Sequence, residues 1–448
     1  MSRRVPSATQ ARRWWAAYAL LPSGLGRDVT FEVSDGRFTA VTPGTAPGDA
    51  VVLPGVVLPG FANAHSHAFH RALRGRTHGG GGTFWTWRER MYAVAAQLDP
   101  DTYLELATAT YAEMALAGIT AVGEFHYLHH GPGGVRYDDH NAMGEALRQA
   151  AASAGIRMTL LDTCYVAGGL SAAGHSPLDT IQLRFGDRRA EGWAQRVADL
   201  EDSEGMRVGA AVHSVRAVPR DQLAVVVAAA AGRPLHIHLS EQPKENQACQ
   251  WFYGLTPTAL LEAEGALGPL TSAVHATHLS DTDISTLGRT GTTACLCPTT
   301  ERDLADGIGP ARRLSDAGSP LSLGSDQHAV TDLLEEARAL EMHERLESLQ
   351  RGRFRPDELL AAATRHESIG WGDAGRLEVG ARADLVAIRL DSRRTAGSAP
   401  EQIMLSASGA DVDTVIVDGR TVVADGQHAL GNVGALLQKA IQPLWENS

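Results

Sequence analysis

The chain has few cysteines and no hydrophobic run long enough to cross a membrane. Its 448 residues contain four cysteines, Cys164, Cys249, Cys295 and Cys297. This number is too small for a disulfide framework in a chain of this length, so we expect buried thiols and a cytoplasmic protein. The apolar stretch from Trp14 to Leu21 is too short to span a bilayer, and we expect no association with membranes.

Lysine and positive charge are also scarce. The chain has only two lysines, Lys244 and Lys439, and its formal net charge is −12. Chemistry that needs a lysine at any other position is therefore excluded. The negative charge argues against a general nucleic-acid surface. It does not exclude an anionic substrate, because the local charge of a site can oppose that of the whole chain.

The pattern of the middle of the chain predicts an α/β fold, a TIM-like (β/α)8 barrel. Apolar segments alternate with Ala- and Leu-rich helical segments such as 102–117 and 221–231, as is typical of βα units. Polar residues gather where the apolar segments end, which is where barrel active sites lie. The eight predicted strands end at 65–67, 124–127, 162–165, 213–216, 236–238, 275–278, 295–297 and 324–326.

Both ends of the chain predict short antiparallel strands. Asp35-Gly36 and Asp418-Gly419 each lie between two alternating segments, which strongly indicates a hairpin. We therefore expect one small β-sandwich domain built from both terminal segments. The predicted domains are 1–57 and 375–448 for the sandwich and 58–374 for the barrel.

The most informative motif is a pair of histidines, His65 and His67, at the end of the first predicted barrel strand. Alternate side chains of a strand lie on one face, so both imidazoles point the same way. Two converging imidazoles at a strand end suit a zinc site that keeps one position open for water. Two ordinary polar residues at a strand terminus would give the same short pattern, so the choice between the two interpretations depends on whether other ligands are present.

Other strand ends supply the donors that would complete such a site. His238 ends the fifth predicted strand and Asp326 the eighth, so three imidazoles and a carboxylate come from three strands. His236 shares a face with His238, but it lies one layer deeper, and we interpret it as a buried, hydrogen-bonded residue. His278 and His328 lie beyond their strand ends and are weaker candidates.

These motifs resemble the amidohydrolase superfamily, whose barrel hydrolases use a histidine pair after strand one, histidines after strands five and six, and an aspartate after strand eight. Within it, the chain is similar to the formimidoylglutamate deiminases of histidine degradation over nearly its whole length. The tryptophan-arginine segment and the end of strand four point to this subfamily. The matching segments are HSHAF at 65–69, FWTWRE at 84–89, EFHY at 124–127, HSVR at 213–216, HIHLSEQ at 236–242, VHATH at 274–278 and GSD at 324–326.

The resemblance implies a role for individual residues. The metal ligands for one Zn²⁺ per chain would be His65, His67, His238 and Asp326. The catalytic residues would be Glu241, His275 and Asp326. The substrate-binding residues would be His70, Arg88, Tyr127, His213 and Arg216. His70 stands where the family pattern has a glutamine, so substrate discrimination at this position is an open point.

Two further expectations come from the resemblance. Binuclear members of the superfamily bridge two metals with a carboxylated lysine at the end of strand four. Here that strand ends without a lysine, so the single-metal site of the deaminases is favoured. We expect a homodimer, by analogy with the family alone.

The expected reaction is the hydrolytic deimination of N-formimino-L-glutamate to N-formyl-L-glutamate and ammonia. Zn²⁺ would activate a water and Asp326 would accept its proton. His275 would stabilise the charge that develops on the attacking oxygen, and Glu241 would relay protons to the leaving nitrogen. Arg88 and Arg216 would hold the carboxylates of this small dicarboxylate, because a guanidinium makes two parallel hydrogen bonds to a carboxylate.

Three other functions stay open at this point. The nearest alternative is another deaminase of the superfamily that acts on a different amidine or on a purine. A binding protein that has lost catalysis is a second class, although such chains usually lose ligands and all the expected ones are present here. An esterase or amidase of the same fold would release no ammonia from an amidine.

Overall fold

The middle of the chain forms the predicted barrel. In the computed structural model, which describes residues 12–79 and 84–446, eight parallel strands form one sheet in the order β14-β13-β12-β11-β10-β7-β6-β5. A bridge between Ser66 and Asp326 joins the first strand to the segment after the last, so the sheet is nearly closed. The strands are β5 (Phe61–Ser66), β6 (Ile119–His126), β7 (Arg157–Cys164), β10 (Met206–Val212), β11 (Leu235–Leu239), β12 (Thr271–His275), β13 (Thr293–Leu296) and β14 (Leu321–Leu323).

These strands confirm the eight that the sequence predicts. Every residue of β6, β7 and β11 is buried. Burial on both faces explains why the segments are nearly continuous apolar runs, because a parallel barrel strand has side chains inside and helices outside. A polar residue in such a run therefore lies at a strand end or has a buried partner.

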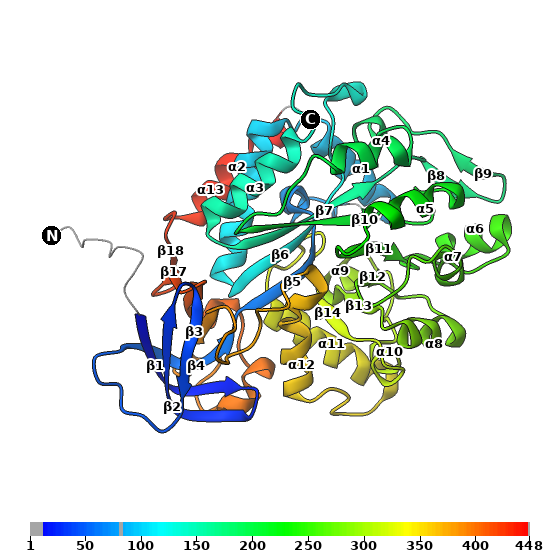
Figure 1. The fold of residues 1–448 in the computed structure, drawn as a ribbon. Coiled ribbons are helices and arrows are strands. Elements are labelled where there is room, and N and C mark those ends of the chain that lie inside the picture. Colours follow the sequence, from blue (N-terminus) through cyan, green and yellow to red (C-terminus); the bar gives the residue numbers. More distant parts are fainter. Residues whose placement is uncertain (1–11, 80–83, 447–448) are drawn as a thin grey trace.

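Helices cover the outside of the barrel (Figure 1). The helix α2 begins after Asp99, whose side chain accepts the backbone N–H of Thr102, and α8 ends at Gly291 with a φ of 67°. None of the described helices has the length and apolar character needed to cross a membrane. The helices are α1 (Phe84–Ala95), α2 (Pro100–Leu116), α3 (Ala142–Ala154), α4 (Ala190–Val197), α5 (Arg220–Ala229), α6 (Pro243–Tyr253), α7 (Pro257–Ala263), α8 (Asp281–Thr290), α9 (Pro298–Asp303), α10 (Ala311–Asp316), α11 (Leu333–Ser348) and α12 (Pro356–Ala363).

The two ends of the chain form a second sheet of eight strands in the order β18-β17-β16-β15-β4-β1-β2-β3. It is antiparallel except for the pair β1 and β4. The predicted hairpins turn at Asp35-Gly36 and Asp418-Gly419, and the positive φ of all four residues matches the two-residue turn that suits twisted strands. The strands are β1 (Arg12–Leu21), β2 (Gly24–Ser34), β3 (Arg37–Thr42), β4 (Val51–Pro59), β15 (Leu385–Ile388), β16 (Val412–Val417), β17 (Arg420–Ala424) and β18 (Gln427–His428).

This second sheet folds over and encloses a core of its own. The N–H of Phe38 in β3 donates to the carbonyl of Ala381 at 3.0 Å, which brings the edge strand against the segment that precedes β15. Trp14, Phe31 and Ile416 belong to the core between them. The last helices, α13 (Val433–Ile441) and α14 (Pro443–Glu446), leave the sheet, and α13 packs against α2 of the barrel (Figure 1).

The domain limits at 57/58 and 374/375 remain proposed limits. The first 11 residues of the predicted sandwich segment lie outside the described residues. The first barrel strand follows β4 after one residue, Gly60, and a Cβ at that position would lie 2.3 Å from Thr120 Oγ1. The two sheets are therefore joined by a close backbone approach that only glycine permits.

Candidate active site

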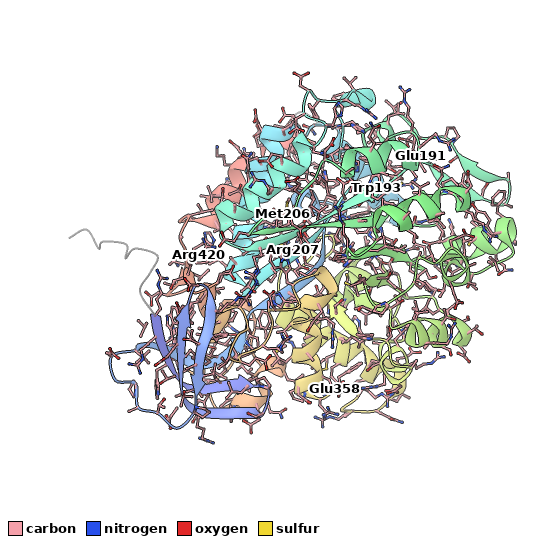
Figure 2. The ribbon with its side chains drawn as sticks, in the orientation of Figure 1. Glu191, Trp193, Met206, Arg207, Glu358 and Arg420 are labelled. Carbon is pink, nitrogen blue, oxygen red and sulfur yellow. The ribbon has the colours of Figure 1, made fainter. Side chains whose placement is uncertain are left out.

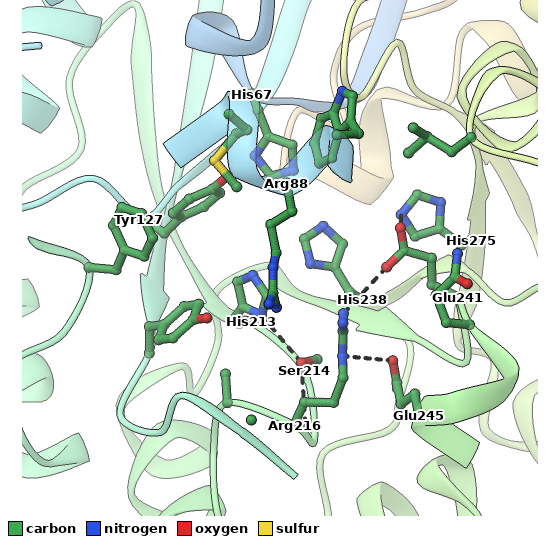
Figure 3. Close-up of a pocket in the computed structure, with 18 of the residues that line it drawn as sticks. His67, Arg88, Tyr127, His213, Ser214, Arg216, His238, Glu241, Glu245 and His275 are labelled. Atoms are coloured by element: carbon green, nitrogen blue, oxygen red, sulfur yellow. Dashed lines mark hydrogen bonds and ion pairs between the residues drawn. The ribbon is translucent and has the colours of Figure 1, made fainter. Parts of the chain in front are cut away.

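A cavity of about 310 Å³ opens at the carboxyl ends of the barrel strands (Figure 3). All but one of the predicted site residues line it: His67, His70, Arg88, Tyr127, His213, Arg216, His238, Glu241, His275 and Asp326. The remaining one, His65, is fully buried beside them, with its ring centre 4.7 Å from that of His67 and 4.9 Å from that of His238. Residues far apart in the chain therefore share one site.

The four predicted metal ligands lie together in two overlapping groups, each with donor atoms within 4.8 Å of one another: His65 with His67 and Asp326, and His65 with His238 and His275. Asp326 Oδ1 lies 3.3 Å from His67 Nε2 and 3.4 Å from His65 Nε2. The Nε2 atoms of His65 and His238 lie 3.1 Å apart. Donors of one tetrahedral zinc are roughly 3.3 Å from each other, because each lies about 2.0–2.1 Å from the metal. The donor set and its spacing therefore fit a metal such as zinc.

A strained turn brings Asp326 to the histidine pair. Asp326 has a φ of 42°, in the left-handed region that a residue with a Cβ rarely adopts. Its N–H donates to the carbonyl of His65 at 3.0 Å, and its carbonyl accepts the N–H of His67 at 3.2 Å. A Cβ at Gly324 would lie 2.7 Å from the Cβ of His65, so glycine is required for this approach. Strain of this kind is typical of functional sites.

Protein contacts also fix the turn that carries the histidine pair. Glu124, at the end of β6, accepts hydrogen bonds from Ser66 Oγ at 2.6 Å and from the N–H of Ala68 at 2.7 Å. Burial raises the pKa of Glu124 to about 7. His67 Nδ1 bonds the carbonyl of Phe125 at 2.9 Å, which turns Nε2 toward Asp326. A backbone partner on the second nitrogen is what orients a ligating imidazole.

Burial sets the charge of the ligands. It lowers the pKa of His65 to about 3 and also lowers those of His67 and His238, so these imidazoles are neutral, which is the form that binds metal. Burial alone would raise the pKa of Asp326, but the hydrogen bond to His65 and the charge of His275 hold it well below its usual range. The site therefore offers neutral nitrogens and one carboxylate.

His275 differs from the other histidines of the site. Burial would lower its pKa, but the carboxylates of Glu241 and Glu301 raise it to about 10. Glu241 Oε1 lies 3.9 Å from His275 Nε2, and Glu301 Oε1 lies 3.6 Å from Nδ1. His275 Nε2 is also 4.0 Å from Asp326 Oδ2. A cationic imidazole beside the ligand carboxylate is suited to stabilising negative charge on a reacting oxygen.

Aromatic and basic side chains line the cavity next to the ligand cluster. Tyr127 OH and His70 Nε2 are hydrogen-bonded at 2.8 Å. The His213 ring packs against Tyr165, with centres 4.4 Å apart. Arg88 comes from α1 and extends across the cavity toward His213 (Figure 3). The predicted substrate residues thus line the same cavity as the predicted metal ligands, and some are in ring contact with them, as His213 is with His238 at 5.1 Å between ring centres.

Two buried glutamates that contact site residues, Glu245 and Glu301, were not among the residues predicted from the sequence. Glu245, in the first turn of α6, lies 3.2 Å from Arg216 Nε through its Oε2. Glu301, in the first turn of α9, contacts His275 as described above. Each lies four residues after another site residue or strand-end residue, Glu241 or Cys297. A glutamate in the first turn of the helix that follows a strand end is the sequence signal that would have identified them.

A second group of metal-type side chains lies in the same barrel, away from the cavity. His126, His129 and Asp162 place donor atoms within 4.8 Å of one another. Asp162, however, accepts two hydrogen bonds from Arg196, at 2.7 and 2.8 Å, and one from Trp193 Nε1 at 2.9 Å. Figure 2 shows Trp193 between α4 and the barrel strands. The charge of the carboxylate is already neutralised, so we assign no metal to this group.

The remaining predictions about histidine and cysteine can be checked directly. His236 is buried and its Nε2 bonds the carbonyl of Ser368 at 2.8 Å, as predicted. His278 bonds the carbonyl of Asp306 at 2.8 Å, and His328 bonds Ser66 Oγ at 3.1 Å. All four cysteines are buried free thiols, as predicted.

The fold and the site define the class of the protein. The family model for amidohydrolases matches residues 56–422. The chain therefore belongs to the amidohydrolase family, and it is an enzyme, a hydrolase that acts on C–N bonds. Among curated relatives, it is 38% identical to formimidoylglutamate deiminase of Pseudomonas aeruginosa over 434 residues, which cover 93% of this chain and 95% of the relative.

Other relatives show how far the similarity extends. The chain is 33% identical to 8-oxoguanine deaminase of Pseudomonas aeruginosa over 390 residues, which cover 83% of each chain. The crystal structure of an amidohydrolase from Brucella melitensis superposes with a TM-score of 0.87 and 31% sequence identity, covering 97% of this chain and 99% of the other. The protein is therefore a deaminase of this superfamily, and several substrates are represented among its relatives.

Proposed function

We propose that this protein is a zinc-dependent deiminase that hydrolyses N-formimino-L-glutamate to N-formyl-L-glutamate and ammonia, a step of histidine degradation. The observation that carries this proposal is that two arginines, Arg88 and Arg216, line the same cavity as the histidine and aspartate cluster. N-Formimino-L-glutamate has two carboxylates and one formamidine group. A purine has no carboxylate for either arginine.

The residues at the reacting end have complementary tasks. A zinc ion held by His65, His67, His238 and Asp326 would supply a water of lowered pKa as the nucleophile. Asp326 also takes up a proton from the attacking water. His275 hydrogen-bonds the attacking oxygen and stabilises its charge. Glu241 carries a proton to the amidine nitrogen, so that the leaving group is ammonia.

The residues at the other end hold the substrate. Arg88 and Arg216 bind its carboxylates, and His213 and Tyr127 complete the wall between them. His70 supports Tyr127 through their 2.8 Å hydrogen bond. Fixing both carboxylates places the formimino carbon next to the ligand cluster, and correct placement of reacting atoms accounts for a large part of enzymatic rate enhancement.

An ammonia-release assay with purified protein tests this function. N-Formimino-L-glutamate is compared with N-formimino-L-aspartate, 8-oxoguanine and adenosine, with and without chelation and zinc re-addition. We expect kcat/KM for N-formimino-L-glutamate to exceed that for the purines by more than about 1,000-fold, because a site built to bind a polar group of its substrate discriminates strongly against ligands that lack this group. Preferred turnover of a purine would reject the proposal.

A further inference from the structure

Arg216 is held between two glutamates of its own chain. Its Nη2 lies 3.3 Å from Glu241 Oε2, and its Nε lies 3.2 Å from Glu245 Oε2. Figure 3 shows both contacts inside the cavity. The guanidinium expected to bind a substrate carboxylate is therefore engaged by protein carboxylates, and one of these belongs to the residue expected to move protons.

The two glutamates are held in different ways. Glu245 has a fully buried side chain, and its Oε1 accepts the N–H of Ser240 at 3.1 Å, so both of its oxygens have fixed neighbours. Glu241 lies in the segment between β11 and α6 and lines the cavity. Its second oxygen is 3.9 Å from His275 Nε2, longer than a hydrogen bond. The contact between Arg216 and Glu241 is thus the one that can be exchanged.

A carboxylate that enters the cavity changes the charge balance around Arg216. The guanidinium would then face three carboxylates, those of Glu241, Glu245 and the ligand, while the cationic His275 faces only the other oxygen of Glu241, 3.9 Å away. Repulsion between like charges is strong where little water screens them. The side chain of Arg216 is only 15% exposed, so water screens this repulsion little. The repulsion is relieved when the ligand carboxylate replaces Glu241 at the terminal nitrogens of Arg216.

We propose that Arg216 restrains Glu241 until a substrate carboxylate displaces it, an inference that rests on the function proposed above. Glu245 is a positioning residue that holds Arg216 in place through Nε during the exchange. Released Glu241 then turns to the reacting end of the cavity, beside His275. The substrate carboxylate therefore contributes to turnover as well as to binding, and amidines without a carboxylate are poor substrates even when they reach the site.

The test compares N-formimino-L-glutamate with formamidine, which has the same reacting group and no carboxylate. Ammonia release is measured with the zinc-loaded wild type and with Arg216→Met. For N-formimino-L-glutamate, kcat/KM should fall by about 100-fold, as expected for loss of a charge-assisted contact. For formamidine it should rise by about fivefold, because Glu241 is no longer held by a charge-assisted hydrogen bond. Opposite changes on one substitution are not expected of a residue that only binds substrate.

A second variant keeps the test valid if the first one folds poorly. Arg216→Met leaves Glu245 buried without its partner, so Arg216→Met combined with Glu245→Gln removes the buried charge as well. Glu245→Gln alone should raise KM for N-formimino-L-glutamate by about tenfold, because one contact of Arg216 is weakened. As a matched control, Glu262→Gln removes an exposed ion pair with Arg289 and should leave kcat/KM for both substrates unchanged.

The outcomes separate this inference from the proposed function. Formamidine turnover that is unchanged, lower or undetectable in both folded, zinc-loaded Arg216 variants would overturn the restraint of Glu241. Failure of the wild type to release ammonia from N-formimino-L-glutamate would instead reject the proposed substrate. The formamidine measurements would still decide whether Arg216 restrains Glu241.

Discussion

Two groups of histidine and aspartate lie in this barrel and differ in what neutralises the carboxylate. In the pocket cluster, His65, His67, His238 and Asp326, the carboxylate faces imidazoles that burial keeps neutral. Its cationic neighbour, His275, lies 4.0 Å away, beyond hydrogen-bond distance. In the inner cluster, His126, His129 and Asp162, the carboxylate is bonded twice by Arg196. The same residue types therefore form an open cation site in one place and a satisfied salt bridge in the other.

The comparison teaches that charge balance, more than residue type, identifies a metal site. A buried carboxylate that no cation contacts at hydrogen-bond distance is costly, so it indicates a ligand that supplies the charge. His129 separates the clusters as well, because both of its ring nitrogens have protein partners: Nε2 bonds the carbonyl of Thr163 at 2.9 Å, and Nδ1 lies 3.3 Å from His126 Nε2. The pocket cluster also lines the cavity, whereas the inner cluster does not.

The largest expected effect is that of Asp326→Asn in the pocket cluster. Loss of the one carboxylate among its ligands should lower kcat/KM by at least about 1,000-fold, because a ligand and a proton acceptor are lost together. Bound zinc should fall and the melting temperature of the apo protein should stay near that of the wild type. Asp316→Asn, on an exposed turn of α10, is the control. Near-normal turnover with full zinc would remove Asp326 from the site.

Asp162→Asn should affect stability instead of activity. It leaves Arg196 buried with Asp187 as its remaining carboxylate, at 3.0 Å. We expect the free energy of unfolding to fall by about 3 kcal/mol, the usual cost of breaking a buried ion pair. Denaturant unfolding and zinc analysis measure the two effects on one sample. If the variant lost zinc and kept its stability, the inner cluster would be a second metal site and the comparison would fail.

The sequence shows where strands end, and that was enough to predict the barrel and to expect the pocket cluster at its carboxyl end. His65 and His67 alternate, and His238 and Asp326 follow apolar runs, so their common edge could be predicted before any contact was known. The role of Arg196 could not be predicted, because it reaches Asp162 from α4, 34 residues away. The contact of Glu245 with Arg216 likewise depends on β10 and β11 being neighbours. The residues that neutralise these charged side chains become neighbours only through the tertiary fold, so spacing along the chain does not reveal them.

Metal analysis sharpens the comparison by counting ions. We expect about one tightly bound zinc per chain, all of it in the pocket cluster. Chelation should abolish ammonia release and lower the melting temperature, because an ion that binds the folded state alone stabilises it. His129→Ala should retain about one zinc and His65→Ala should lose it. Two zinc ions in the wild type, reduced to one by His129→Ala, would contradict the assignment.

The smallest expected effect is at His70. This histidine lies beside the pocket cluster, but a hydrogen bond to another protein side chain holds it, as in the inner cluster. Its Nε2 bonds Tyr127 OH at 2.8 Å. His70→Gln keeps a hydrogen-bonding group, and we expect kcat/KM for N-formimino-L-glutamate to stay within about threefold of the wild type. His70→Ala should lower it by about fivefold, the value of one neutral hydrogen bond.

A double-mutant cycle with Tyr127→Phe isolates this contact. If His70 acts through Tyr127, the coupling free energy between the two substitutions should be about 1 kcal/mol, and His70→Ala should cost little more in the Tyr127→Phe background. Fully additive effects would show that His70 acts without Tyr127. A loss of zinc in His70→Ala would instead place His70 with the ligands, since its ring centre is only 4.6 Å from that of His67. Additive effects would remove the proposed support of Tyr127 by His70, and zinc loss would reassign His70 from a hydrogen-bonding role to the metal site.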